Sequence, residues 1–466
     1  MSTPSLGRSV DDPVVADVLA RARAGFSSGR TRSRRWRVEQ LQNLIRLLDE
    51  REEQIAAALA ADLGRSAAEA WFGDISSTRG EAVFALKHLR GWMRRRRQPL
   101  PIVQQPGSGW IQYEPLGVVL IIGPWNYPVV LTLAPLIAAL SAGNCAVVKP
   151  SELVPTTSNL LARLLPEYLD SEAVFVVEGG AEVTQDLLAQ GFDHAVFTGG
   201  TEVGKKIMAG AAATLTPVTL ELGGKSPVIV TADADLDVVA RRVAWVKFMN
   251  SGQTCIAPDY ILVDERVRQA LVEKLVATTK KFERGDDPRG RRIINERQFD
   301  RLVGYLTGTK GELALGGNSY RPQLRVEPTI LVDPDPSDAV MQEEIFGPIL
   351  PVLSYSSLDE AIAFVNGRPK PLAAYYFSTS KRDQRRLVDE IPSGGAVVNH
   401  LAMHFLVPQL PFGGVGASGM GAYHGRWGFE TLSHRKSVLK KTFWPDLSLM
   451  YPPYTDKALR IMRKVL

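Results

Sequence analysis

Residues 115–148 form an uncharged stretch that constrains the fold more than any other feature of the sequence. A run of this length can cross a bilayer as one helix. Pro124, Pro128 and Pro135 interrupt it, however, and leave pieces that are each too short to span a membrane. The stretch is therefore expected to lie in a buried α/β core, and the chain is expected not to cross a membrane.

These pieces begin a repeating strand–helix pattern. The stretch predicts a strand at 118–122, a helix at about 128–141 and a second strand at 145–148. Three more short apolar runs, separated by helix-like segments, follow at 173–177, 194–197 and 218–220. Five strands that alternate with helices predict an α/β fold with a parallel sheet and right-handed crossovers.

A second strand-and-helix region follows the first, and a helical region precedes it. Strand-like runs recur at 226–230, 260–263, 329–332, 349–353 and 373–377, with helix-like runs at 236–250, 267–282 and 358–366. Residues 14–97 carry charges between apolar residues at helical spacing, which predicts amphipathic helices. A chain of 466 residues has room for two or three domains.

Loops follow the carboxyl ends of the predicted parallel strands, where open α/β sheets bind ligands. One of them, residues 199–206, has the spacing of a phosphate-binding loop, Gly-x-x-x-x-Gly-Lys. Lys206 stands where a nucleotide triphosphatase needs a metal-binding hydroxyl. The turn at Gly199 and Gly204 therefore suits the pyrophosphate of a dinucleotide that binds without a metal.

The chain has two cysteines, which excludes a disulfide scaffold or a cysteine-rich metal site and fits a reducing compartment. Cys145 lies in an apolar strand and is expected to pack in the core. Cys255 lies among small polar residues, which favours an exposed, nucleophilic thiol over an inert one. His400 and His404 have a metal-like spacing, but no acidic residue completes a zinc pattern, so no metal site is expected.

A thiolate that adds to a carbonyl creates an oxyanion, which needs hydrogen-bond donors. Asn126, a polar side chain at a strand end, is the candidate amide; the alternative is a turn asparagine. Partial burial would raise the pKa of Glu221 and suit it to act as a base, unless it caps a helix or forms a salt bridge. Glu344 and Phe346 could bind a sugar hydroxyl and a flat ring, or occupy a surface turn.

Charge and the first residues bear on partners and location. The formal net charge is +5 and the pI is near 9.0, too small an excess over this length to indicate a nucleic-acid partner. The first twelve residues lack the basic start and apolar core of a secretory signal. A cytoplasmic protein is therefore expected.

Five motifs, in this order, carry a resemblance to a known family. They are Gly-Pro-Trp-Asn-Tyr-Pro at 123–128, Leu-Glu-Leu-Gly-Gly-Lys-Ser-Pro at 220–227, Ser-Gly-Gln-Thr-Cys at 251–255, Glu-Ile-Phe-Gly-Pro at 344–348 and Pro-Phe-Gly-Gly-Val-Gly at 411–416. The chain resembles the NAD(P)-dependent aldehyde dehydrogenases, most of all the class 3 branch of dimeric enzymes for fatty or aromatic aldehydes. The similarity runs from the helical N-terminal region to about His434.

The resemblance implies a role for each matching residue. Cys255 is the expected nucleophile, Asn126 the oxyanion-hole amide and Glu221 the general base. The expected cofactor contacts are Lys149 and Glu152 with the adenosine ribose, Gly199 and Gly204 with the pyrophosphate, Glu344 and Phe346 with the nicotinamide ribose and ring, and also Trp125 and Leu222. Gly200 departs from the family, which commonly has Ser there, and this affects one hydroxyl contact to phosphate.

The resemblance also implies how the chain is divided. The expected parts are a Rossmann-type cofactor-binding domain at 1–97 and 115–220, a catalytic α/β domain at 221–398, a small oligomerisation arm at 98–114 and 399–440, and a C-terminal tail at 441–466. By similarity the protein is expected to form a homodimer.

The C-terminal tail predicts a short basic amphipathic helix. Its apolar residues Ala458, Leu459, Met462 and Val465 are interleaved with lysines and arginines. Such a helix could pack on its own subunit, cover the substrate tunnel or rest peripherally on an anionic membrane surface.

We therefore expect oxidation of a medium- or long-chain aliphatic or aromatic aldehyde to its acid, through a thiohemiacetal and a thioester on Cys255. The expected cofactor is NAD or NADP, with NAD slightly favoured because Glu152 suits a ribose 2′-hydroxyl, although Lys149 can offset its charge. One alternative is a CoA-acylating dehydrogenase, which would not need Glu221 as a water-activating base. The other is a non-catalytic nucleotide-binding protein of the same fold.

Overall fold

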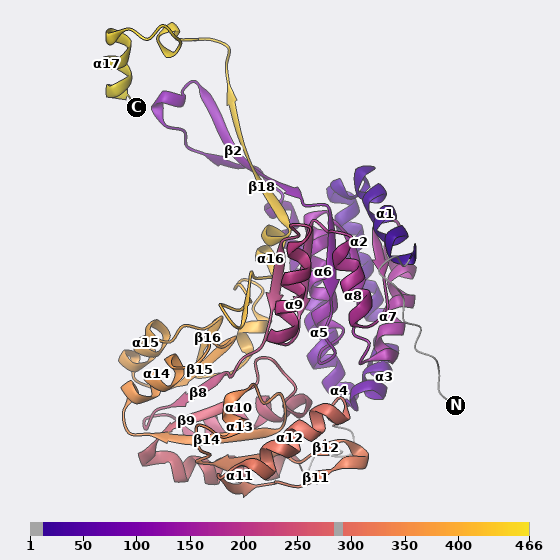
Figure 1. Cartoon of the computed structure of the whole chain (residues 1–466), viewed down its shortest axis with the longest axis vertical. Coiled ribbons are helices and arrows are strands. Elements are labelled where there is room, and N and C mark those ends of the chain that lie inside the picture. The colour runs from indigo at the N-terminus through magenta and orange to yellow at the C-terminus, as the bar shows by residue number, and fades with distance from the viewer. Residues whose placement is uncertain (1–12, 284–291, 466) are drawn as a thin grey trace.

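The computed structural model describes residues 13–283 and 292–465. Residues 1–12, which bear on the expectation about a secretory signal, lie outside the described part, as do 284–291 and 466. In Figure 1 the described chain forms two sheet-containing parts side by side and a ribbon that projects away from them. The predicted α/β fold is confirmed.

A six-stranded sheet contains the five strands expected in the first half of the chain. Its order is β17 (Gly419–Met420), β7 (Val218–Glu221), β6 (His194–Thr198), β3 (Val118–Ile122), β4 (Cys145–Lys149) and β5 (Val174–Val176). All neighbours are parallel except β17, which pairs antiparallel with β7. Every residue of β3, β4 and β6 is buried, as expected for parallel strands covered on both faces.

The strand order of this sheet fixes where a ligand can bind. The chain runs outward from β3 through β4 to β5 and then returns to the other side of β3 with β6 and β7. The order therefore reverses between β3 and β6, which is the switch point where dinucleotide-binding sheets open a crevice. The loops that begin at Gly123 and Gly199 leave the carboxyl ends of these two strands.

Helices surround this sheet (Figure 1). The N-terminal region folds into α1 (Pro13–Ser27), α2 (Arg34–Glu50), α3 (Glu52–Leu63), α4 (Ala67–Ala70) and α5 (Ser76–Trp92). The crossovers are α6 (Val130–Ala142), α7 (Pro155–Tyr168), α8 (Ala181–Ala189) and α9 (Thr201–Ala212). A π-helical segment, Trp71–Ile75, joins α4 to α5. All thirteen residues of α6 are buried, so the uncharged stretch lies in the core rather than in a membrane.

A seven-stranded sheet forms the second part. Its order is β10 (Glu312–Leu315), β13 (Thr329–Val332), β14 (Ile349–Tyr355), β9 (Tyr260–Asp264), β8 (Pro227–Val230), β15 (Ala373–Phe377) and β16 (Gly395–Val398). Its helices include α10 (Leu236–Phe248), α11 (Arg268–Glu283), α12 (Glu296–Gly308), α13 (Ala339–Gln342), α14 (Leu358–Asn366) and α15 (Lys381–Glu390). Val130, Leu131 and Ala134 of α6 join the apolar core of this sheet, so α6 packs in both parts.

The projecting ribbon is an antiparallel sheet of β1 (Arg96–Gln98), β2 (Gly107–Pro115) and β18 (Ser433–Lys441). The sequence assigned residues 399–440 to an arm, and β18 from this range joins the ribbon. Leu401, Phe412 and Tyr423 are buried in the core of the seven-stranded sheet, because they supply apolar side chains between the glycines and prolines. Residues 399–432 therefore pack against the body of the molecule.

The C-terminal segment ends in the predicted short helix, α17 (Asp456–Val465). It lies at the far end of the ribbon, away from both large sheets (Figure 1). Within residues 13–283 and 292–465, no helix combines the length and the apolar character that crossing a bilayer requires.

The burial of β3 leads to a first prediction. Leu120→Ala removes a fully buried side chain from a strand with neighbours on both sides, so it should lower the free energy of unfolding by ~2–5 kcal/mol. Met208→Ala, on the exposed side of α9, should change it by only ~0.5 kcal/mol. Chemical denaturation of the two variants measures this difference, and equal losses would contradict the placement of β3 in the core.

Candidate active site

Two loops from different sheets are hydrogen-bonded to each other at the switch point. The Asn126 side chain, in the loop after β3, donates from Nδ2 to the carbonyl of Gln253 at 3.1 Å. Asn250 Nδ2 donates back to the Asn126 carbonyl at 3.0 Å. The hydroxyls of Tyr127 and Thr254 lie 3.0 Å apart. These contacts bring Asn126 to the segment that ends at Cys255.

Cys255 is half-buried and packs against the apolar core of the seven-stranded sheet. Burial raises the pKa of its thiol, and the negative charges of Glu344 and Glu221 raise it further. The sequence indicated a more exposed thiol. At neutral pH the resting thiol is therefore protonated and needs a base. Cys145, by contrast, is fully buried in β4, where burial raises the pKa of its thiol to about 12.

Glu221 ends β7 with only 2% of its surface exposed. Among the described residues, neither of its carboxylate oxygens has a hydrogen-bond partner. Burial raises its pKa well above the usual value. The alternatives of a helix cap or a salt bridge do not match this environment, whereas a proton acceptor does.

Glu344 reaches the same region from the segment before β14. A Cβ atom at Gly223 would lie 1.9 Å from Glu344 Oε2, so only glycine at this position permits the approach. Burial raises the pKa of Glu344 to about 8, and the charge of Asp259 adds to this effect. The charges of Lys225 and Arg301 oppose the shift.

Three charged side chains hold the main chain around Glu344. Arg301 donates to the carbonyls of Glu344 and Ile345 at 2.9 and 2.7 Å. Asp259 accepts from the Ile345 N–H at 2.9 Å and forms an ion pair with Lys225. The position of Glu344 is therefore fixed by the seven-stranded part of the molecule.

Aromatic and apolar side chains surround the crevice. The rings of Trp125 and Phe346 pack edge to face with their centroids 5.3 Å apart. Leu222 is buried, and a Cβ atom at Gly204 would lie 2.7 Å from its Cδ2, so the first turn of α9 packs closely on this side chain. Such a border suits a flat, partly apolar ring.

Polar groups for a dinucleotide lie at the ends of the neighbouring strands. Lys149, buried at the end of β4, donates to Glu152 at 3.0 Å, and the Glu152 side chain is half-exposed. Gly199 packs on the Phe197 ring, which leaves no room for a side chain, while a Cβ atom at Gly200 would meet nothing within 4 Å. A serine at position 200 would fit. The residues present therefore fit a dinucleotide, and Gly200 lacks only the hydroxyl that a serine at this position would offer to phosphate.

The two histidines do not share a site. His400 Nδ1 is in contact with the Leu401 main chain. The His404 ring packs against Phe412 and Tyr375, and burial lowers its pKa to about 4. The described part of the chain contains no group of three histidine, cysteine or acidic residues that could hold a metal ion.

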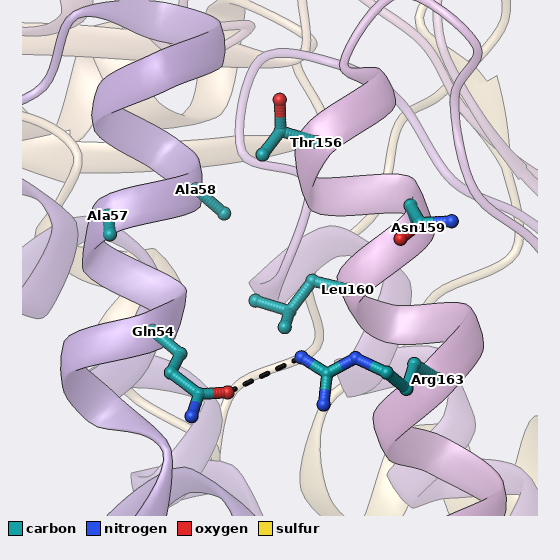
Figure 2. A pocket seen from close by; sticks show the side chains of 7 residues that line it. All are labelled: Gln54, Ala57, Ala58, Thr156, Asn159, Leu160 and Arg163. Carbon is teal, nitrogen blue, oxygen red and sulfur yellow. Dashed lines mark hydrogen bonds between the residues drawn. The ribbon is translucent and has the colours of Figure 1, made fainter.

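A hollow between α3 and α7 lies apart from this crevice (Figure 2). Across it, Arg163 donates to Gln54 at 3.4 Å. Its lining is Gln54, Ala57, Ala58, Thr156, Asn159, Leu160 and Arg163. None of the residues expected to react or to bind the cofactor lines it.

The sequence did not single out several residues that hold the two loops. Arg65 and Asp74 form a buried ion pair beside Asn126, and Asn250 bonds to both loops. Arg65 and Asp74 lie in the region 14–97, for which the sequence predicted amphipathic helices. In the sequence, the one feature that could have pointed to Arg65 and Asp74 was a short, irregular stretch between two amphipathic helices.

A parallel sheet of this strand order, with a thiol, two carboxylates and an amide gathered at its carboxyl edge, is the arrangement of a dinucleotide-dependent dehydrogenase. The chain belongs to the aldehyde dehydrogenase family, whose model matches residues 8–438. It is therefore an NAD(P)-dependent aldehyde dehydrogenase, which oxidises an aldehyde, and the family expected from the motifs is confirmed.

Known relatives cover nearly the whole chain. Aldehyde dehydrogenase family 3 member A2 of Mus musculus is 49% identical over 95% of this chain and 92% of its own length. A Rattus norvegicus protein named aldehyde dehydrogenase, dimeric NADP-preferring, is 46% identical over 96% and 99%. A structure described as the substrate-bound state of Staphylococcus aureus AldH is 41% identical, covers 97% and 99%, and superposes with a TM-score of 0.93.

The raised pKa of Glu344 leads to a second prediction. Between its ordinary pKa of 4.5 and the folded value of about 8, the folded protein binds more protons than the unfolded chain, so this residue lowers stability as the pH rises. In Glu344→Gln, the melting temperature without cofactor should fall less across this range than in the wild type. Glu343→Gln, at an exposed neighbouring position, should follow the wild type. Identical profiles for Glu344→Gln and the wild type would refute the assignment.

Proposed function

We propose that Cys255 is the nucleophile for the aldehyde, Asn126 supplies the oxyanion-hole amide and Glu221 is the general base. The observation that carries this proposal is the hydrogen-bonded pair of loops, which brings Asn126 to the Cys255 segment beside an unpartnered carboxylate. The CoA-acylating and non-catalytic alternatives gain no support, since the relatives compared are named aldehyde dehydrogenases and their names do not mention CoA.

The first step forms a bond between Cys255 Sγ and the aldehyde carbon. Glu221 accepts the thiol proton, which its raised pKa favours, and the carbonyl oxygen becomes an oxyanion. One hydrogen of Asn126 Nδ2 is donated to Gln253, and the second is free to bind the oxyanion together with the Cys255 N–H. Removal of such a donor typically costs about 3–4 kcal/mol of transition-state stabilisation.

The second half of the reaction converts the adduct into the acid. The chemistry that the bound cofactor supplies is acceptance of a hydride at its nicotinamide ring. The product of this oxidation is a thioester on Cys255. Glu221 first releases the thiol proton to solvent and then accepts a proton from a water molecule, whose oxygen attacks the thioester carbon. Return of this proton to Cys255 Sγ as the C–S bond breaks releases the carboxylic acid and the thiol.

The proposed cofactor contacts are those expected from the motifs. Glu344 is proposed to accept hydrogen bonds from the nicotinamide ribose, with Trp125 and Phe346, whose rings pack against each other, beside the nicotinamide ring. Lys149 and Glu152 are assigned to the adenosine ribose. Gly199 and Gly204 of the glycine turn, with the adjoining Leu222, are assigned to the pyrophosphate.

We further propose a division of the chain by function. Residues 1–97 and 115–220 bind the cofactor, residues 221–398 carry the nucleophile, and the ribbon is the oligomerisation arm of a homodimer. Support comes from the separate sheets and from the word dimeric in the name of the rat relative.

Substrate range and location are proposed from the same relatives and from the tail. A medium- or long-chain aliphatic or aromatic aldehyde is the proposed substrate, in a cytoplasmic enzyme with two free thiols. The tail, residues 441–466, is proposed to make at most peripheral membrane contact. Phe443 and Trp444 are exposed in the segment that leads to the basic helix α17, which suits an anionic surface.

The assigned roles lead to a third prediction. Glu221→Gln should slow the first-turnover burst of NADH, because it removes the acceptor of the thiol proton, and should slow steady turnover by roughly 100-fold, because it also removes the base for hydrolysis. Cys255→Ala should abolish both, and Cys145→Ala should leave both unchanged. Stopped-flow absorbance at saturating aldehyde and NAD separates these outcomes. Activity that survives in Cys255→Ala would remove the basis of the proposal.

Cofactor choice leads to a fourth prediction. The Glu152 carboxylate would repel the 2′-phosphate of NADP, and its ion pair with Lys149 weakens this effect. The interaction of a half-exposed charge is worth ~1 kcal/mol, so Glu152→Gln should raise the NADP-to-NAD ratio of kcat/KM about fivefold. Glu167→Gln, at the distant end of α7, is the control. An unchanged ratio in Glu152→Gln would mean that this residue does not face the ribose 2′ position.

A further inference from the structure

Arg65 and Asp74 form an ion pair in the interior of the molecule. Arg65 lies between α3 and α4, Asp74 lies in the π-helical segment, and their exposed fractions are 5% and 0%. Neither comes from a loop of the crevice. Their charges nevertheless lie directly behind the two loops that meet there.

The Arg65 guanidinium bonds to both of these loops at once. Its Nη2 donates to the main-chain carbonyl of Asn126, and its Nε donates to Asn250 Oδ1 at 3.1 Å. Its face also lies 4.2 Å from the centre of the Tyr127 ring, whose hydroxyl contacts Thr254 next to the nucleophile. One side chain therefore links the segment that carries the amide with the segment that carries the thiol.

Asp74 holds both the guanidinium and the helix that follows Asn126. One of its oxygens pairs with Arg65 Nη1, and the other accepts the N–H groups of Val129 and Val130 at 2.9 and 2.8 Å. These N–H groups are at the start of α6 and would otherwise have no partner within the helix. The loop from Gly123 to Val129 is thus fixed at its end and, through Arg65, at Asn126.

The backbone around this pair is arranged to let it approach. A Cβ atom at Gly73 would lie 2.9 Å from the Tyr127 ring and 3.7 Å from Arg65 Nη1. The π-helical turn at Trp71–Ile75 adds a residue to the helix at this point, and such turns occur often at functional sites. The close approach depends on both features.

Stability alone is a weak explanation for this pair. Desolvation of two buried charges offsets most of their attraction, so an apolar pair of similar volume would stabilise the fold as well or better. The hydrogen bonds of Arg65 go instead to the two loops that carry Asn126 and lead to Cys255, whose relative orientation matters for the reaction. A carbonyl and a side-chain amide on opposite loops need one donor group of fixed, planar geometry, which guanidinium supplies and ammonium does not.

We propose that Arg65, held by Asp74, is a positioning residue that fixes the Asn126 main chain and thereby aims the Asn126 amide at the oxyanion. This inference rests on the proposed role of Asn126. Because a displacement of about 1 Å can cost roughly 100-fold in rate, loss of the guanidinium is expected to affect the chemical step. It is not expected to affect binding of the adenosine ribose, since Lys149 ends β4 and Glu152 lies in the turn that follows this strand.

The experiment is a double-variant cycle on full-length enzyme, with Arg65→Met, Asn126→Ala and the two combined. The readout is the single-turnover rate constant of NADH formation, with KM for NAD and the melting temperature measured alongside. Arg65→Met should slow NADH formation by roughly 10- to 100-fold with KM for NAD within about twofold. Asn126→Ala should slow it by at least about 100-fold. The double variant should be no more than about threefold slower than Asn126→Ala.

Three further variants keep the test decisive. Arg65→Lys retains the charge without the fork and should recover part of the rate; it replaces Arg65→Met in the cycle if that variant does not fold. Asp74→Asn can still cap α6 but leaves the buried Arg65 guanidinium without its counter-ion, so it should slow the reaction and also lower the melting temperature. Arg37→Lys is the control, because Arg37 is equally buried and bonds only to main-chain carbonyls far from the crevice.

Each outcome has one meaning. Multiplicative effects of Arg65→Met and Asn126→Ala, or an equal loss of rate in Arg37→Lys, would overturn the positioning role while the proposed function stands. A normal rate in Arg65→Met would do the same. A normal rate in Asn126→Ala would instead remove the proposed oxyanion role, and the positioning role with it.

Discussion

The contact between the loop after β3 and the loop that ends at Cys255 is the constraint on which the rest of the site depends. Each loop belongs to a different sheet, and the Asn126 amide joins them through the carbonyl of Gln253 at 3.1 Å. The two apolar cores pack separately, so their relative position must be fixed closely enough for this hydrogen bond to form. Helix α6, which follows Asn126, packs in both cores and transmits this requirement to the whole fold.

Burial determines the chemistry at this contact. Burial raises the pKa values of Cys255, Glu221 and Glu344, and the charges of Glu344 and Glu221 raise the pKa of Cys255 further. A base whose pKa is raised is better matched to a weakly acidic thiol than an ordinary carboxylate would be. Transfer of a single proton from Cys255 to Glu221 leaves the total charge of the site unchanged. This step therefore adds no net charge to a buried site.

Local sequence predicts much of this fold but not all of it. Strands β3 and β15 have the bounds expected, because buried parallel strands are continuous apolar runs. Strands β10 and β16 were missed, because they are four residues long with exposed positions and thus lack a clear pattern. The five motifs located the groups assigned to the chemistry. Arg65 and Asp74 were not found, since only tertiary contacts distinguish a buried charge from a solvated one in this region.

Backbone strain near the nucleophile explains why charged side chains support this region. Asn250, Ser251 and Phe346 have φ values of 52°, 53° and 47°, in the left-handed region that side chains disfavour. Such residues cost of order 1–3 kcal/mol each and persist only where their surroundings determine them. Asn250 is held by Arg65, and the peptide units on either side of Ile345 are held by Arg301 and Asp259. The fixed positions of the thiol and of Glu344 thus depend on hydrogen bonds made by buried or partly buried charges from other elements, and those bonds offset the local strain.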